Sequence, residues 1–138
     1  MIETLVNILL KESWMTKNKY KHISNEIYYS DGGFCAVDIH DILFLKEAAL
    51  RSAQKRSRVC FHAQASDTQQ EMLIVTHKSS YIRPHRHIEK LETLTIIDGQ
   101  CHALIFDDTG NLINNIFMTK ASDGGCFFYR MPAQCYHS

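Results

Sequence analysis

The hydrophobic positions at the start of the chain follow a helical spacing. Four apolar side chains recur at i, i+3, i+4 and i+7: Ile2, Leu5, Val6 and Leu9. This spacing predicts an amphipathic helix that ends near Trp14. A polar stretch and a candidate strand at residues 26–29 follow, and the glycine-containing residues 30–33 predict a turn.

A second helical pattern begins close to residue 40. Asp38 or Asp41 is the expected N-terminal cap, because a short acidic side chain accepts hydrogen bonds from the free amides of a helix start. The inner face of this helix is predicted to carry Ile42, Leu45, Ala49 and Ala53.

From Arg58 onward the pattern becomes that of strands. Short apolar segments alternate with turn signals that contain Asp, Ser and Gly. The predicted strands are residues 57–62, 71–77, 91–97, 101–106, 112–119 and 126–130. Several short strands at nearly regular spacing are typical of a sandwich or barrel. The sequence therefore predicts a mainly β fold, a small antiparallel barrel preceded by one or two packing α-helices.

Composition narrows the class of protein. The chain has 138 residues, which suits one domain, and its 15 Lys and Arg residues balance 15 Asp and Glu residues. This zero net charge argues against binding to a phosphate backbone, so we expect no nucleic-acid partner. No apolar run approaches the roughly 20 residues of a membrane helix, and the acidic start is unlike a secretory leader. We therefore expect a cytoplasmic protein that does not bind membranes.

Histidine carries more information here than cysteine. The five cysteines include no CxxC pair, which argues against a disulfide framework or a four-thiolate zinc site. His85 and His87 are separated by one residue, and Glu92 follows. Side chains two apart in a strand share a face, so both imidazoles are expected to project in the same direction, together with Tyr81 and Arg83.

Two imidazoles and one carboxylate that converge on a point make a site for one divalent transition metal ion. His137, after the last predicted strand, is the expected fourth ligand. Such a ligand set leaves one or two positions open for water or substrate, as a reactive metal requires. These ligands accept Zn, Fe, Ni and Mn, so the sequence leaves the identity of the metal open.

Other polar side chains are candidates for binding a substrate in the same cavity. Arg83 shares the ligand face and suits an anionic or hydroxylated substrate, or else an ion pair with a neighbouring acid. Arg58 and His62 share a face of their predicted strand, where His62 suits either substrate binding or a buried, hydrogen-bonded role. Tyr81 and Tyr129 offer phenol groups, although packing in the core is the favoured interpretation for both.

The metal-ligand spacing resembles a known family. His85-x-His87-x4-Glu92-x6-Gly99 resembles the first motif of the cupin superfamily, and residues 132–137 resemble the second. Residues 58–62, 71–74 and 80–87 are similar to the WbuC family of small cupin-fold metalloproteins, whose genes often lie among those for O-antigen synthesis. The resemblance covers about residues 41–137. It implies a cupin-type double-stranded β-helix and implies that His85, His87, Glu92 and His137 are the metal ligands.

The sequence departs from the general cupin motifs near the fourth ligand. Gln134 stands where the second motif often has Gly, so we expect a turn that forms without a residue at positive φ. His137 precedes the last residue of the sequence, so we expect it to fray unless the metal or a partner chain holds it.

The resemblance also implies a domain organisation and a function. Residues 41–138 would form the barrel, and residues 1–40 a helix and extension that pack on it, in one domain overall. We expect a metal-dependent enzyme, of isomerase or epimerase type, acting on a sugar or a sugar-derived metabolite, with His62 or Tyr129 moving protons. The family's gene neighbourhood implies a link to lipopolysaccharide biosynthesis.

Two other functions suit the same residues. One is an Fe(II)-dependent oxygenase, and the other is a non-catalytic sensor or sugar-binding module in which the metal anchors the ligand. The expected partners are a small-molecule ligand of sugar type and a second copy of the chain. Because an uncovered edge strand needs a partner, we expect a homodimer with the N-terminal helix near its interface.

Overall fold

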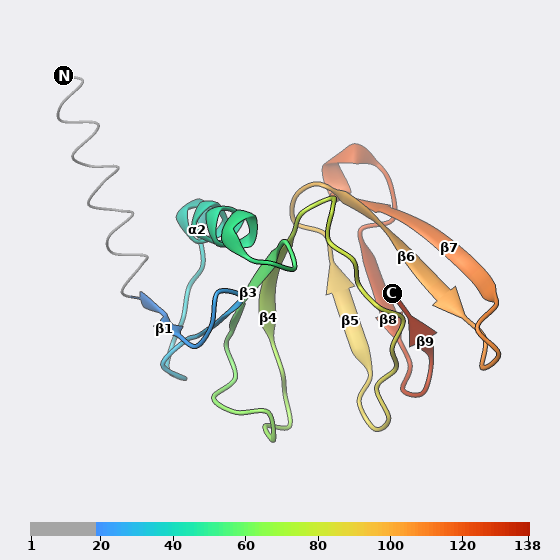
Figure 1. Cartoon of the computed structure of the whole chain (residues 1–138), viewed down its shortest axis with the longest axis horizontal. Coiled ribbons are helices and arrows are strands. Elements are labelled where there is room, and N and C mark those ends of the chain that lie inside the picture. The colour runs from blue at the N-terminus through green and yellow to red at the C-terminus, as the bar shows by residue number, and fades with distance from the viewer. Residues whose placement is uncertain (1–18) are drawn as a thin grey trace. The chain divides into compact units, whose positions relative to one another are not determined.

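The computed structural model describes residues 19–138. The helix predicted to end near Trp14 lies outside these residues. The chain divides into two compact units, the first extending to Tyr81 and the second comprising Ile82–Ser138. Figure 1 shows that each unit has its own strands. The domain boundary predicted between residues 40 and 41 is a different division, and it stays a prediction.

The first unit is built on a sheet of four strands in the order β1-β2-β3-β4. These strands are β1 (Lys21–His22), β2 (Ile27–Tyr29), β3 (Arg56–Cys60) and β4 (Met72–Thr76). β2 and β3 run parallel, with Tyr28 opposite Val59, whereas the other two strand pairs are antiparallel. Because side chains alternate along a strand, Ser57 and Val59 of β3 share one buried face.

Helix α2 (Ile39–Arg51) packs on that buried face. Leu45 and Ala48 lie in the hydrophobic core of this unit with Val59. Leu45 and Ala49 are buried as the sequence predicts. Ala53 lies beyond the end of the helix and is exposed, so its predicted place on the inner face is wrong.

Both predicted cap residues hold the start of α2. Asp38 is the N-cap and accepts a hydrogen bond of 2.8 Å from the amide of His40. The carboxylate of Asp41 accepts the backbone N–H of Asp38 at 2.8 Å, which completes a capping box. Asp41 is buried, and it also accepts hydrogen bonds from the Tyr20 hydroxyl at 2.8 Å and from Lys19 Nζ at 2.9 Å. This network ties the segment before β1 to the helix.

The second unit contains two sheets and a short 3-10 helix. Its elements are β5 (Glu92–Thr95), β6 (Gln100–Phe106), β7 (Leu112–Thr119), η1 (Ala121–Asp123), β8 (Phe128–Met131) and β9 (Tyr136–His137). β5 pairs with β8, and β6 lies between β7 and β9; all of these pairs are antiparallel.

The structure confirms the mainly β class and the six strands predicted after residue 56, to within a few residues at their ends. Within residues 19–138 the strands form three separate hydrogen-bonded sheets and do not close into a continuous barrel. The parallel pairing of β2 with β3 also departs from the predicted antiparallel arrangement. Across the described part of the chain, helix length and hydropathy rule out a helix that could cross a membrane.

Candidate metal centre

The segment that carries His85 and His87 is extended but is not a regular strand. His85 forms an isolated antiparallel bridge with His137, in which each backbone N–H donates to the other residue's carbonyl at 2.9 Å. Farther along, the amide of Gln134 donates to the carbonyl of His87 at 2.7 Å. Backbone hydrogen bonds therefore hold the two ligand-bearing segments side by side.

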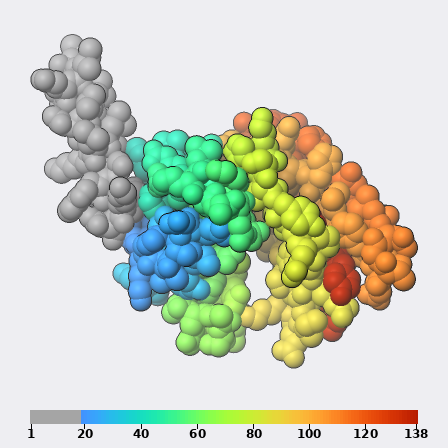
Figure 2. All heavy atoms as spheres, in the orientation of Figure 1, coloured from blue at the N-terminus to red at the C-terminus, as the bar shows by residue number. Residues whose placement is uncertain are grey.

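His137 is fixed by the chain itself. It pairs with Ile105 of β6, and the next residue, Ser138, exchanges two backbone hydrogen bonds of 3.0 Å with Leu104. The residue is only 4% exposed. Figure 2 shows the red atoms of the C-terminal residues between yellow and orange atoms of the same unit. The expectation that His137 frays unless a metal or a partner chain holds it is therefore wrong.

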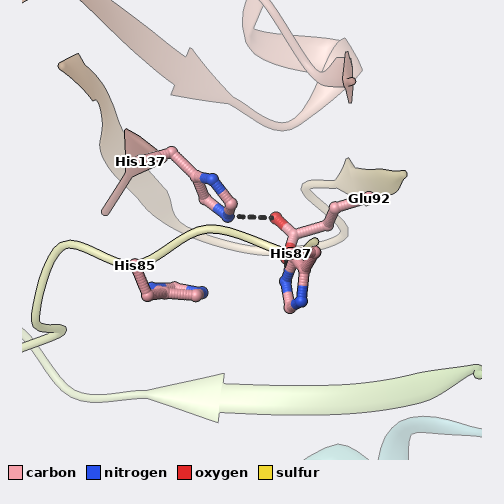
Figure 3. Close-up of side chains that lie close together, drawn as sticks. All are labelled: His85, His87, Glu92 and His137. Carbon is pink, nitrogen blue, oxygen red and sulfur yellow. Dashed lines mark hydrogen bonds and ion pairs between the residues drawn. The ribbon is translucent and has the colours of Figure 1, made fainter. Parts of the chain in front are cut away.

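Four side chains meet in the second unit, and they are the four predicted ligands. One donor atom from each of His85, His87, Glu92 and His137 lies within 4.8 Å of the other three. The two oxygens of Glu92 face different rings: Oε2 is 3.1 Å from His87 Nε2, and Oε1 is 3.5 Å from His137 Nε2. Figure 3 shows the imidazoles and the carboxylate converging from three separate segments.

Hydrogen bonds to the backbone set the tautomers of two of these histidines. Nδ1 of His85 lies 3.0 Å from the carbonyl of Arg83, and Nδ1 of His137 lies 2.9 Å from the carbonyl of Cys135. A carbonyl oxygen accepts a hydrogen bond, so Nδ1 carries the proton in both rings. The lone pair of Nε2 is then free to bind a metal ion, in the usual arrangement of a metal-binding histidine.

One buried nitrogen of the cluster makes no hydrogen bond. Nε2 of His137 is buried and lacks a hydrogen-bond partner, although buried polar atoms are nearly always satisfied. A cation at the centre of the cluster would satisfy this nitrogen. The residues present therefore fit a transition metal ion, with borderline nitrogen ligands and one anionic oxygen ligand.

Tyr129 of β8 holds the carboxylate of the cluster. Its hydroxyl donates a hydrogen bond to Oε1 of Glu92 from the neighbouring strand. Burial by itself raises the pKa of Glu92, but the hydrogen bond from Tyr129 and the nearby imidazoles of His137 and His87 outweigh burial and lower that pKa overall. Glu92 is therefore ionised at neutral pH, as a metal ligand must be.

The turn before β9 contains a residue at positive φ. Gln134 has φ +70°, in the left-handed region that favours glycine, and its amide is the donor to the His87 carbonyl. The expectation that this turn forms without a positive-φ residue is wrong. Because glutamine has a Cβ atom, the left-handed conformation strains the backbone at this position.

The group of four candidate ligands does not include the other predicted site residues. Arg83 and Tyr81 are exposed, which rules out core packing for Tyr81. Arg58 and His62 lie in the first unit, where His62 Nδ1 is 3.3 Å from the Glu71 carbonyl. Their roles in substrate binding stay predictions.

Sequence reasoning missed the positive φ of Gln134 and the contact between Arg86 and Tyr136. The guanidinium carbon of Arg86 lies 4.7 Å from the centre of the Tyr136 ring. Each of these two residues is next to a candidate ligand in the sequence, and alternation along extended chain places both on the side away from the cluster. Their contact depends on the His85–His137 bridge, which no local pattern predicts.

Comparison with known protein families gives a match over much of the chain. A family model described as "Domain of unknown function (DUF6016)" matches residues 37–118, a span that includes His85, His87 and Glu92. No curated protein and no solved structure gives a significant match.

Proposed function

The chain belongs to the family described as "Domain of unknown function (DUF6016)", and since that description names no activity, we propose a function from the site itself. We propose that the protein binds one divalent transition metal ion through His85, His87, Glu92 and His137. In this proposal it has a cupin-type fold related to the WbuC family, and it is a metal-dependent enzyme that acts on a sugar or a sugar-derived metabolite.

The single observation that carries the proposal is the convergence of four donor atoms within 4.8 Å. A chance group of exposed acids rarely contains three imidazoles, and here one imidazole is buried with an unpartnered nitrogen. Four protein ligands also leave room at a metal that takes five or six. The ion would then be able to bind a substrate as well as to hold the chain.

The chemistry proposed is an isomerisation or epimerisation. A divalent ion, when bound, polarises a carbonyl group or orients two neighbouring hydroxyls of the substrate. Glu92 and the histidines hold the ion, and the Tyr129 hydroxyl holds Glu92 through its hydrogen bond. Arg83, of the same unit as the four candidate ligands, is proposed to contact the substrate, and Tyr129 of that unit is proposed as the group that moves a proton. The substrate roles of Arg58, His62 and Tyr81 stay predictions from the sequence.

The sugar substrate and the link to lipopolysaccharide biosynthesis rest on the family resemblance of the ligand motif. A cytoplasmic location stays a prediction from the sequence. The homodimer has separate support from β7, an edge strand of its sheet. Three apolar residues of that strand, Leu112, Ile113 and Phe117, are each about half exposed or more, which a second copy of the chain would cover.

Metal reconstitution tests this function. Protein purified without a metal-affinity tag is stripped and reloaded with Zn²⁺, Mn²⁺, Ni²⁺ or, without oxygen, Fe²⁺. Each form is assayed for aldose–ketose conversion of free and phosphorylated sugars and for oxygen uptake. We expect conversion of a sugar with at least one metal, and loss of that conversion in Glu92→Ala but not in the matched Glu89→Ala, an exposed acid on the same segment.

Other results of this experiment would favour one of the two alternative functions. Oxygen uptake with iron and no sugar conversion would replace the proposal with an oxygenase. Tight sugar binding without a product, measured by calorimetry, would leave a binding module. Failure of every metal to bind would reject the metal site itself.

A further inference from the structure

We infer that Arg86 and Tyr136 form a positioning pair on the reverse side of the metal cluster and set its affinity for a metal ion; this rests on the proposed metal site. The cation of Arg86 lies over the ring of Tyr136, with its guanidinium carbon 4.7 Å from the ring centre. Neither side chain belongs to the four-residue cluster.

The position of the two residues in the chain makes this contact unusual. Arg86 stands between His85 and His87, and Tyr136 stands directly before His137. The two segments run antiparallel through the bridge between His85 and His137. Successive side chains of extended chain point to opposite sides, so the histidines face the cluster while Arg86 and Tyr136 meet behind it.

The pair therefore joins the same two segments that the metal would join. Between the two segments, the backbones of His85 and His137 exchange two hydrogen bonds of 2.9 Å. On the face away from the cluster, the guanidinium of Arg86 lies over the Tyr136 ring. The side-chain contact adds to the backbone hydrogen bonds in limiting rotation of the extended segment about its own axis, and that rotation would turn His85 and His87 away from Glu92.

Arg86 also forms an ion pair. Nη1 of Arg86 lies 3.7 Å from Oδ1 of Asp108, in the turn between β6 and β7. Asp108 is largely exposed, so this ion pair contributes little to stability by itself. Asp108 follows β6, in which Phe106 lies opposite Tyr136, so the ion pair links Arg86 to the strand that also pairs with the Tyr136 segment.

The positive charge of Arg86 by itself is unfavourable for metal binding at this site. A cation one residue from two metal ligands repels a divalent ion, and a purely electrostatic role would weaken metal binding. A positioning role strengthens it, because the ligands are already held in place before the ion arrives. The two roles predict changes of opposite sign when the charge is removed.

The test compares metal affinities of variants by competition with a chromophoric chelator, using Zn²⁺, and records the visible spectrum of the Co²⁺ form. We expect Arg86→Gln and Tyr136→Leu each to weaken Zn²⁺ binding about fivefold, the size of an exposed cation–π contact. Arg86→Lys and Tyr136→Phe keep a cation and a ring, so both should stay close to the wild type. The Co²⁺ spectrum should change in Arg86→Gln, because the ligand geometry loosens.

Arg130→Gln is the matched control, since Arg130 is an exposed arginine on β8 of the same unit. Unchanged Zn²⁺ affinity in both Arg86→Gln and Tyr136→Leu, with a metal-binding wild type, would overturn the positioning role alone. Tighter binding in Arg86→Gln would overturn it in favour of simple charge repulsion. A wild type that binds no Zn²⁺ or Co²⁺ would reject the proposed metal site, and the positioning role with it.

Discussion

The hydroxyl of Tyr129 donates a hydrogen bond to the carboxylate of Glu92, so β8 fixes a candidate ligand that β5 carries. The hydroxyl is the part of Tyr129 that reaches the cluster. Removing it leaves the ring in place but lets the carboxylate rotate.

Tyr129→Phe is therefore expected to weaken metal binding about 10-fold or more, the usual effect of losing a hydrogen bond behind a metal ligand. Chelator competition measures the change, and thermal unfolding of the metal-free protein checks that the fold is kept. The matched control is Tyr81→Phe, because Tyr81 is 74% exposed. Equal affinities of Tyr129→Phe and the wild type would contradict the role given to Tyr129.

Gln134 is predicted to be a strained position. Its φ of +70° favours glycine, so Gln134→Gly should stabilise the protein by about 0.5–1 kcal/mol in denaturant unfolding. Ala133→Gly, at a neighbouring residue without positive φ, should instead destabilise it by a similar amount. Destabilisation by both substitutions would show that the turn does not need the left-handed conformation.

Asp41 is predicted to make the first unit sensitive to acid. Burial alone would raise the pKa of Asp41, but hydrogen bonds from Lys19, the Asp38 amide and Tyr20 outweigh it and lower that pKa below its ordinary value. A carboxyl group with a lowered pKa in the folded state stabilises the fold above its ordinary pKa of about 3.9. This contribution is lost as the pH falls through the lowered value.

Asp41→Asn should accordingly destabilise the protein by about 2 kcal/mol at pH 7, the size of hydrogen bonds to a charged group. The difference from the wild type should shrink below pH 4. Thermal unfolding as a function of pH measures both effects, and Glu47→Gln on the exposed side of α2 is the control. A difference that stays constant from pH 7 to pH 3 would contradict the ionised state of Asp41.

Strand β7 is predicted to lie at a dimer interface. It is eight residues long, carries no charged residue and lies at the edge of its sheet, and natural proteins usually protect such edges with charge. We expect sedimentation to show a dimer at micromolar concentration and Ile113→Lys to give a monomer. Leu43→Lys, at a half-exposed position on α2, should remain dimeric. A monomeric wild type would end this interpretation.

Three of the four candidate metal ligands were predictable from the sequence for a local reason. His85, His87 and Glu92 lie within eight residues, and their spacing carries the geometry of an extended segment followed by a turn and a strand. The strands from residue 56 onward were likewise predictable, because their apolar segments are bounded by clear turn residues. The start of α2 was predictable from Asp38 and Asp41, because acidic side chains accept hydrogen bonds from the free amides at a helix start.

The features that escaped prediction depend on contacts between distant segments. β9 is two residues long and exists because the chain returns to β6, which no local pattern encodes. The parallel pairing of β2 with β3 likewise needs the helix between them to reverse the direction of the chain. Gln134 has no local mark of its left-handed conformation, since glutamine seldom adopts it.

The metal content of the purified protein tests the central claim most directly. Elemental analysis of protein prepared without a metal-affinity tag should find about one divalent transition metal ion per chain. His137→Ala and Glu92→Ala should each fall well below that ratio, while His102→Ala, an exposed histidine of the same unit, should keep it. A wild type without metal under metal-replete expression, or full occupancy in both ligand variants, would contradict the account.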